Sequence, residues 1–240
     1  PYLLEEWQTG QKIVLKRKEN WWGNQLKGQG MYFNIHPSKI IFQTINDETT
    51  AKEALKAEEI DVMRGIKAQD FNELKKTKKF TANFNYYTPP QMAYTYLGIN
   101  TRKPMFTDKK TRQALAHLID VNKIIDAIVL GYGTKAIGPI HPSQKKQFNN
   151  NIQPYDFNPE KAKVLLAEVG WKDSDGDGIL DNTIAGEKMK FEMSYIYNQG
   201  NDARKAVGLM FQEEARKVGI TVNVIAQDWS IFIENSKQHN

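Results

Sequence analysis

Short segments rich in β-branched and aromatic residues are spaced along the chain, with amphipathic stretches between many of them. The first pattern predicts strands, because such side chains pack well on a pleated surface that is buried on one face. We expect the strand over 94–99 to be central in its sheet. Strands are predicted over residues 11–17, 39–45, 80–87, 94–99, 188–197 and 220–226.

Helices are predicted where apolar residues recur every three or four positions behind a residue that can cap the first turn. The first of them starts with a capping box, in which Glu53 follows Thr50 by three residues. The expected starting residues are Thr50, Asp108, Asp120, Asn158 and Asp202. Glycines are predicted to end three of these helices: Gly131, Gly170 and Gly219.

Because the predicted strands and helices alternate, the fold class is α/β with a mixed sheet. The pair Pro89-Pro90 breaks regular structure and is the predicted domain boundary. Residues 131–154 are rich in Pro, Gly and Asn, which predicts a long loop.

Composition excludes several classes of protein. The chain has 240 residues, of which 40% are hydrophobic and 25% charged, ordinary values for a globular protein. The net charge of +5 is spread out and accompanies no nucleic-acid-binding motif, so nucleic acid is not an expected partner. Cysteine is absent, which excludes thiol catalysis, zinc-thiolate sites and disulfides.

An acidic, Gly-rich turn over residues 173–181 is the candidate metal site. Asp173, Asp175, Asp177 and Asp181 match the oxygen-ligand spacing of a calcium loop, but Ile184 stands where the bidentate Glu is required. The turn is therefore either a Ca²⁺ site or a tight turn without metal.

Catalytic motifs are missing from the sequence. The four histidines, His36, His117, His141 and His239, have no metal-binding or catalytic spacing, and His117 is expected to be packed or on the surface. There is no Gly-x-Ser-x-Gly elbow and no paired-carboxylate signature, so a hydrolase acting on peptide or glycan is disfavoured. We expect a protein that is not an enzyme and needs no cofactor beyond the Ca²⁺ considered above.

The chain contains a series of short motifs whose order and spacing are informative. They read PY at 1–2, WQTG at 7–10, AKEALKAEEID at 51–61, YLGIN at 96–100, RQAL at 112–115, YDFNPEKA at 155–162 and LLAEVGW at 165–171. Their order and spacing resemble the extracellular solute-binding proteins of family 5, which include the oligopeptide and dipeptide receptors of ABC importers. The chain departs from the family pattern at 57–61, where the usual turn glycine is missing.

The resemblance implies a periplasmic-binding-protein-like fold of type II, with mixed sheets and two partial lobes joined at a hinge. Residues 1–90 would be part of the first lobe and 91–240 most of the second. It also implies an internal fragment that lacks the C-terminal return, because family members are about twice as long. The chain begins at Pro1 without a leader, and the family's proteins are exported, either to the periplasm or to a lipid anchor at the cell surface.

By the same resemblance, the protein is the substrate-binding component of an ABC transporter, which captures peptides between two lobes and passes them to a membrane permease. The implied ligand-binding residues are Tyr94, Tyr96, Asn100, His141 and Trp229. Aromatic rings would supply adaptable contact area, while backbone hydrogen bonds hold the peptide.

Other interpretations of these residues stay open. The hydroxyls of Tyr94 and Tyr96 could lie at a sheet edge with their rings in the core, and Trp229 could serve lobe packing. Asn100 could instead pin the turn before Pro104. Alternative functions are a receptor for a nickel complex, glutathione or an oligosaccharide, or a calcium-dependent interaction module.

Overall fold

The computed structural model describes residues 1–238 and divides the chain into two compact units, Pro1–Phe84 and Asn85–Asn240. The boundary therefore lies ahead of the Pro89-Pro90 pair at which the sequence predicted it. His239 lies outside the described residues.

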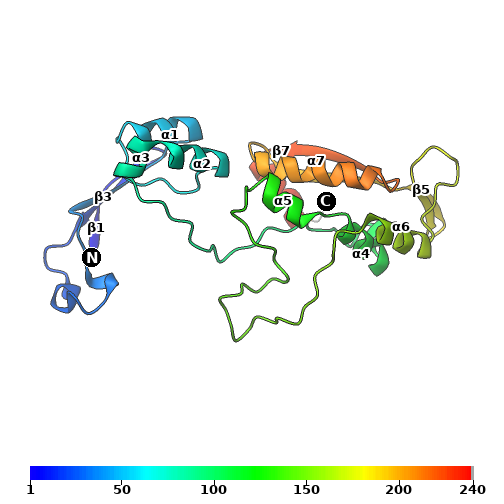
Figure 1. Ribbon diagram of the computed structural model, residues 1–240, viewed down its shortest axis with the longest axis horizontal. Helices are drawn as coiled ribbons and strands as arrows, with labels where there is room; N and C mark the ends of the chain where they lie inside the picture. The colour runs from blue at the N-terminus through cyan, green and yellow to red at the C-terminus, as the bar shows by residue number, and fades with distance from the viewer. Residues whose placement is uncertain (239–240) are drawn as a thin grey trace. The chain divides into compact units, whose positions relative to one another are not determined.

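The first unit pairs a small antiparallel sheet with three helices (Figure 1). The sheet has the order β1-β2-β3, formed by Tyr2–Gln8, Lys12–Arg17 and Lys39–Gln43. The long β2–β3 connection contains two 3₁₀ turns, η1 at Trp22–Leu26 and η2 at Met31–Phe33. The helices are α1 (Glu48–Lys56), α2 (Ala68–Lys76) and α3 (Lys78–Asn83).

Two predictions for this unit are corrected by the structure. Asp47, rather than Thr50, caps α1, and its carboxylate accepts hydrogen bonds from the Thr50 amide at 2.7 Å and the Thr50 hydroxyl at 2.8 Å. The strand expected over 80–87 is wrong, because α3 occupies its first half. Phe80 and Phe84 are four residues apart, so a helical turn stacks their rings at 4.6 Å and buries Phe80.

The second unit contains most of the regular structure. Its helical elements are η3 (Pro104–Phe106), α4 (Lys109–His117), α5 (Val121–Ala127), α6 (Pro159–Glu168), α7 (Asp202–Arg216) and α8 (Trp229–Gln238). The strands are β4 (Asp181–Ile184), β5 (Glu187–Lys190), β6 (Glu192–Asn198) and β7 (Thr221–Gln227). Strands β4 and β5 form an antiparallel hairpin, whereas β6 and β7 pair in parallel across the α7 connection.

Local signals placed the helix starts of this unit well. Asp108, Asp120 and Asn158 accept hydrogen bonds from the backbone amides of Lys110, Lys123 and Lys161, as N-caps do. The cap of α7 is Asn201, so Asp202 is its first helical residue.

Two of the strand predictions for this unit are corrected by the structure. The strand predicted over 188–197 is broken at Phe191 into β5 and β6. The central strand predicted over 94–99 is wrong, since the segment has no regular structure. An isolated strand leaves its backbone hydrogen-bonding groups unpaired, and no described residue provides the segment with a partner strand.

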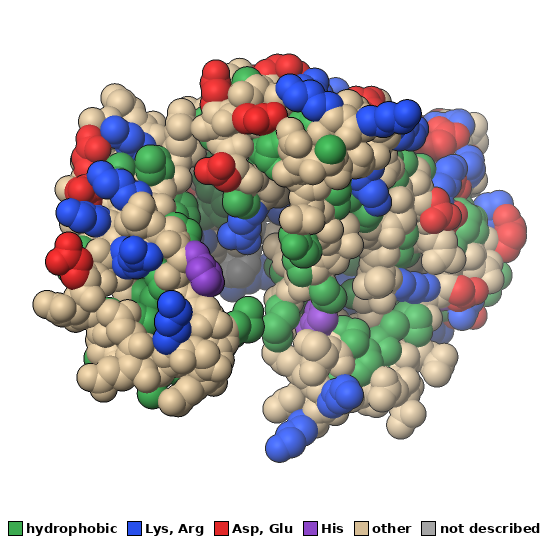
Figure 2. Space-filling view, turned by 60° about the vertical axis from the view of Figure 1, so that its left-hand side comes forward, with side chains coloured by type: hydrophobic (Ala, Val, Ile, Leu, Met, Phe, Trp, Pro, Cys, Tyr) green, Lys and Arg blue, Asp and Glu red, His purple; other side chains and the backbone are tan. Residues whose placement is uncertain are grey.

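One connected hydrophobic core lies in the second unit, between the sheets and helices α4, α6 and α7. Its centre is Phe191, which is fully buried and faces Trp171 with ring centroids 4.3 Å apart. Large hydrophobic side chains also remain exposed, and Figure 2 shows several scattered among charged ones on the face that it presents. Within residues 1–238, no helix combines the length and hydrophobicity needed to cross a membrane.

Candidate functional site

Tyr94 and Tyr96 form an exposed aromatic pair on the segment that leads to η3. They are two residues apart on a non-helical chain, and their ring centroids lie 5.5 Å apart at an angle of 38°. Tyr94 is 49% exposed and Tyr96 is 71% exposed. The rings therefore do not lie in the core of this unit, and they offer contact area with a polar tip.

Asn100 lies at the turn that follows the tyrosines. Its side-chain oxygen accepts a hydrogen bond from the Arg102 amide at 3.1 Å, and its carbonyl oxygen accepts one from the Lys103 amide at 3.2 Å. The side chain thus holds the turn ahead of Pro104, which is the alternative role considered for it.

Trp229 is the first residue of α8 and is 57% exposed. Its ring stacks on Phe232 with centroids 5.8 Å apart, and the Arg204 guanidinium lies over the Phe232 ring at 5.7 Å. Asp228 fixes the start of this helix, because its carboxylate accepts hydrogen bonds from the hydroxyl and amide of Ser230. The hydroxyl bond is the main cause that lowers the pKa of Asp228. Among the described ring contacts, none joins Trp229 to the tyrosine pair.

His141 forms a local turn within the long loop after α5. Its Nδ1 lies 2.8 Å from the Ser143 hydroxyl and accepts a hydrogen bond from the Ser143 amide at 3.1 Å. Because Nδ1 accepts from a backbone donor, the neutral imidazole carries its proton on Nε2.

The acidic turn gathers three of the four predicted aspartates. Carboxylate oxygens of Asp173, Asp175 and Asp177 lie within 4.8 Å of one another, and all three side chains are exposed. The ammonium group of Lys190 forms an ion pair with Asp177 and lies 3.5 Å from Asp175. Its hydrogen bond is the main cause that lowers the pKa of Asp177, while Asp177 raises the pKa of Lys190. A side-chain cation from β5 thus already offsets part of the negative charge of this turn.

Asp181 is separate from that group because its carboxylate is hydrogen-bonded to Ser174. It is 4% exposed and accepts hydrogen bonds from the Ser174 amide at 3.0 Å and the Ser174 hydroxyl at 2.6 Å and 2.7 Å. The hydroxyl bond is the main cause that lowers the pKa of Asp181, and Lys188 at 3.7 Å adds to it. Asp181 therefore closes the base of the turn.

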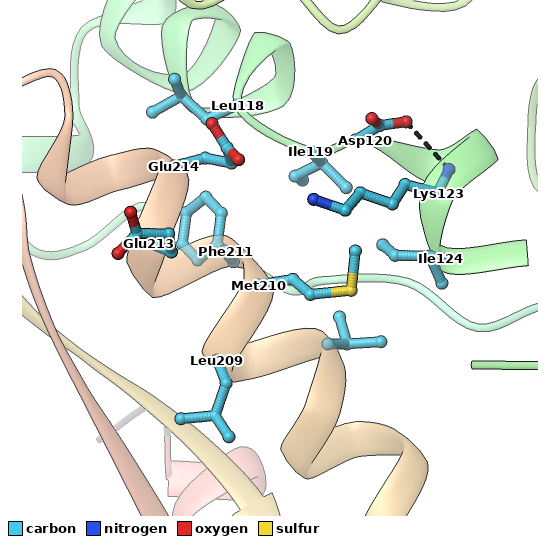
Figure 3. A pocket seen from close by; sticks show the side chains of 11 residues that line it. Leu118, Ile119, Asp120, Lys123, Ile124, Leu209, Met210, Phe211, Glu213 and Glu214 are labelled. Atoms are coloured by element: carbon cyan, nitrogen blue, oxygen red, sulfur yellow. Dashed lines mark hydrogen bonds between the residues drawn. The ribbon is translucent and has the colours of Figure 1, made fainter. Parts of the chain in front are cut away.

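The structure also brings together residues to which the sequence assigned no site. A cavity of about 250 Å³ lies between the α4–α5 region and α7 (Figure 3). Its apolar wall includes Ile119, Ile124 and Met210, and the Lys123 side chain extends between Ile119 and Met210. The helical periodicity of α5 and α7 predicted inward-facing apolar residues, but it carried no sign that space would remain between them.

His117 is fully buried and anchors the end of the long loop to α4. Its Nδ1 lies 2.7 Å from the Asp156 carbonyl oxygen and 3.2 Å from the Asp156 carboxylate. The ring also meets Tyr155 edge-on, with centroids 5.3 Å apart. Of the two roles expected for His117, the structure selects packing.

Comparison with known proteins gives these features a context. Residues 1–240 match the family described as bacterial extracellular solute-binding proteins, family 5 Middle. The chain is 32% identical to the oligopeptide-binding protein AppA of Bacillus subtilis and 27% identical to the nickel-binding periplasmic protein of Escherichia coli. These alignments cover 100% and 96% of this chain, respectively, but 41% of each relative.

The fold is shared with solved structures. The structure of Bacillus subtilis AppA in complex with a nonapeptide matches with a TM-score of 0.73 and 31% identity, over 98% of this chain and 43% of that one. The predicted α/β fold of the periplasmic-binding-protein type is thereby confirmed. The chain spans about two fifths of the length of the relatives it matches.

Proposed function

The chain belongs to family 5 of the bacterial extracellular solute-binding proteins, and from that premise we propose that it is part of a receptor that captures peptides for an ABC importer. The observation that carries the proposal is the match along the whole chain to an oligopeptide-binding protein, at a higher identity than to a nickel-binding one. The protein would act outside the cell membrane and hand its solute to a membrane permease. We assign it no chemical reaction.

The segment before η3 supports a peptide as the solute. The backbone of residues 91–99 has no strand partner among the described residues, so its amides and carbonyls could pair with an extended ligand backbone. Tyr94 and Tyr96 border that backbone with 49% and 71% of their surfaces exposed. Backbone pairing beside aromatic rings would hold many peptide sequences with little preference for their side chains.

The remaining candidates fit around this arrangement in different roles. Trp229 would add a further aromatic surface in the second unit, and His141 would present Nε2–H from its loop. Asn100 would act indirectly, by holding the turn that follows the tyrosines. The two units, Pro1–Phe84 and Asn85–Asn240, would contribute to two lobes.

The cargo class is tested on the full-length protein by thermal-shift measurements with a mixed peptide library, nickel–histidine complexes, glutathione and oligosaccharides. We expect peptides alone to raise the melting temperature, since a ligand at about 100 times its Kd stabilises by about 2.7 kcal/mol. Mass spectrometry of material that co-purifies should then recover peptides. Recovery of a metal complex or a sugar instead would overturn the peptide assignment.

A paired substitution locates the site. Tyr94→Ala with Tyr96→Ala should weaken peptide binding, whereas Tyr132→Ala, which removes another exposed tyrosine of the same unit, should leave it unchanged. Equal binding by all three proteins would remove the tyrosine pair from the site.

The acidic turn receives a structural role within this proposal. Lys190 and the backbone amides of residues 176 and 178 already contact its carboxylates. These contacts favour a turn that is stabilised by the protein's own groups rather than a calcium-dependent interaction module. A melting temperature that is the same with calcium and with a chelator would support this role. A fall on chelation would instead favour the calcium-dependent alternative.

A further inference from the structure

The connection between β2 and β3 carries a cluster of aromatic side chains, in which Trp21 and Phe33 are partly buried and Trp22 is exposed. The rings of Trp21, Trp22 and Phe33 lie 5.5–6.2 Å from one another. Trp22 is 70% exposed, and the neighbouring Tyr32 is 82% exposed. We call residues 18–38 the aromatic loop.

Contacts within the aromatic loop keep this cluster in place. The Trp21 ring packs against Gly23, where a Cβ atom would overlap the ring. The Asn24 side chain donates a hydrogen bond to the Glu19 carbonyl at 2.9 Å, and the Asn34 side chain accepts one from the Gly28 amide at 3.1 Å. The Trp22 ring is therefore preorganised by Trp21 and Phe33, which lowers the entropy cost of docking it on another surface.

Charge is distributed very unevenly around these rings. The whole chain is nearly balanced, with 33 basic and 28 acidic residues, but residues 16–38 contain four basic residues and one acidic residue. No Asp or Glu occurs between Glu19 and Asp47. Within residues 16–38, the exposed ammonium groups of Lys16, Lys18 and Lys27 have no ion-pair partner among the described residues.

The loop projects from the end of the sheet away from α1, α2 and α3 (Figure 1). By contrast, Lys12 and Lys39 of the adjoining strands are neutralised by Glu6 at 3.1 Å and Glu5 at 2.7 Å. Lys16 is therefore the lysine of the three strands that has no ion pair among the described residues, and it lies at the end of the sheet from which the aromatic loop projects.

From this combination we infer that the aromatic loop is a docking surface for an anionic lipid bilayer. Tryptophan and tyrosine favour the membrane–water interface, because their rings are apolar and their N–H or O–H groups remain hydrated. Lysines beside them are attracted to anionic headgroups. Shallow insertion of Trp22, Met31 and Tyr32 would hold this face of the protein at the membrane.

Binding is measured with the full-length protein, without solute, by co-sedimentation with vesicles of equal parts phosphatidylglycerol and phosphatidylcholine. We expect binding to these vesicles but not to pure phosphatidylcholine, a blue shift of tryptophan emission, and loss of binding at high salt. Absence of binding to the anionic vesicles at low salt would overturn the inference, even if the loop then proved to contact a protein.

Two variants separate the charge from the rings. Lys16→Glu, Lys18→Glu and Lys27→Glu together should weaken binding by at least about 100-fold, since each basic side chain near an anionic surface contributes about fivefold. Trp22→Ser with Tyr32→Ser should weaken it by about tenfold or more and abolish most of the blue shift.

Matched controls exclude general effects of charge and folding. Lys103→Glu, Lys145→Glu and Lys146→Glu make the same change of net charge at exposed positions of the other unit, and Trp7→Ser removes an exposed tryptophan from β1. Both controls should bind vesicles within about twofold of the parent protein. Equal losses in the controls and in the aromatic-loop variants would contradict the inference. The assay contains no solute, so its failure would leave the receptor proposal standing.

Discussion

Among the described residues of the unit Asn85–Asn240, thirteen buried ones form one connected core, whereas the unit Pro1–Phe84 buries five hydrophobic side chains. The sheet of the first unit leaves apolar residues such as Trp7, Ile41 and Phe42 more than half exposed. Hydrophobic burial is the main favourable term in folding and grows with the area removed from water. The second unit is therefore expected to resist unfolding, and the first to open locally at lower cost.

The largest expected effect comes from the centre of the second unit. Phe191→Ala removes a fully buried ring that contacts Trp171, and it should lower the free energy of unfolding by about 3–5 kcal/mol. Urea unfolding followed by tryptophan fluorescence checks this value. A loss below about 1 kcal/mol would mean that this core relaxes around the cavity.

A matched truncation in the first unit should lower the free energy of unfolding by less, and its effect should stay within that unit. Leu55 is 3% exposed on α1, and Leu55→Ala should lower stability by about 2–3 kcal/mol. Hydrogen exchange should accelerate in α1 and the β1–β3 sheet while β6 and β7 keep their protection. Acceleration of β6 and β7 to the same degree would contradict the difference between the units.

A smaller effect is expected where α7 crosses β6. A Cβ at Gly208 would lie 2.5 Å from the ring of Tyr195, whose hydroxyl donates a hydrogen bond to the Arg204 carbonyl. Overpacking costs about 1–3 kcal/mol, and the higher helix propensity of alanine offsets about 1 kcal/mol of it. Because 2.5 Å is well inside van der Waals contact, the overpacking cost lies in the upper part of its range, about 2–3 kcal/mol. Gly208→Ala should therefore lower the free energy of unfolding by about 1–2 kcal/mol. Unchanged stability would show that Tyr195 moves aside freely.

The smallest predicted effect depends on pH and involves Asp181 in the second unit. Its pKa is lowered in the folded state by the Ser174 hydroxyl. A carboxyl group with a depressed pKa stabilises the fold above the pKa of the unfolded chain, about 3.9. That contribution is lost as the pH falls below about 4 and passes through the folded pKa.

Ser174→Ala should reduce the loss of stability at acid pH. The measurement is the melting temperature as a function of pH, from neutral pH to below about 4. Ser143→Ala is the control, because Ser143 contacts His141 rather than a carboxylate. Parallel curves for the parent protein and Ser174→Ala would contradict the role of Asp181.

Predictions that rest on neighbouring residues succeeded. Asp108, Asp120 and Asn158 cap their helices because the donor amide lies two or three residues away in the same chain segment. The gathering of Asp173, Asp175 and Asp177 followed from their spacing in the same way. The error at α1 arose because Asp47 and Thr50 both have capping side chains, and only the fold selected Asp47.

Predictions that require a distant partner had mixed outcomes. The strands predicted over 11–17, 39–45 and 220–226 are confirmed as β2, β3 and β7, but others failed or were incomplete. Residues 94–99 have the composition of a strand, but no described strand pairs with them. Lys190 reaches the acidic turn because the β4–β5 hairpin folds back, and the sequence contains no local sign of that ion pair. The candidate site was predicted as a set of residue types, whereas its geometry depends on such long-range contacts.

The sequence by itself determined the family, the α/β class and the caps of α4, α5 and α6, because ordered motifs and short-range hydrogen bonds are encoded in neighbouring residues. Only the tertiary structure decided which aromatic rings remain exposed and which carboxylate is diverted to Ser174. Exposure and ion pairing depend on the segments that pack nearby, and those segments are remote along the chain.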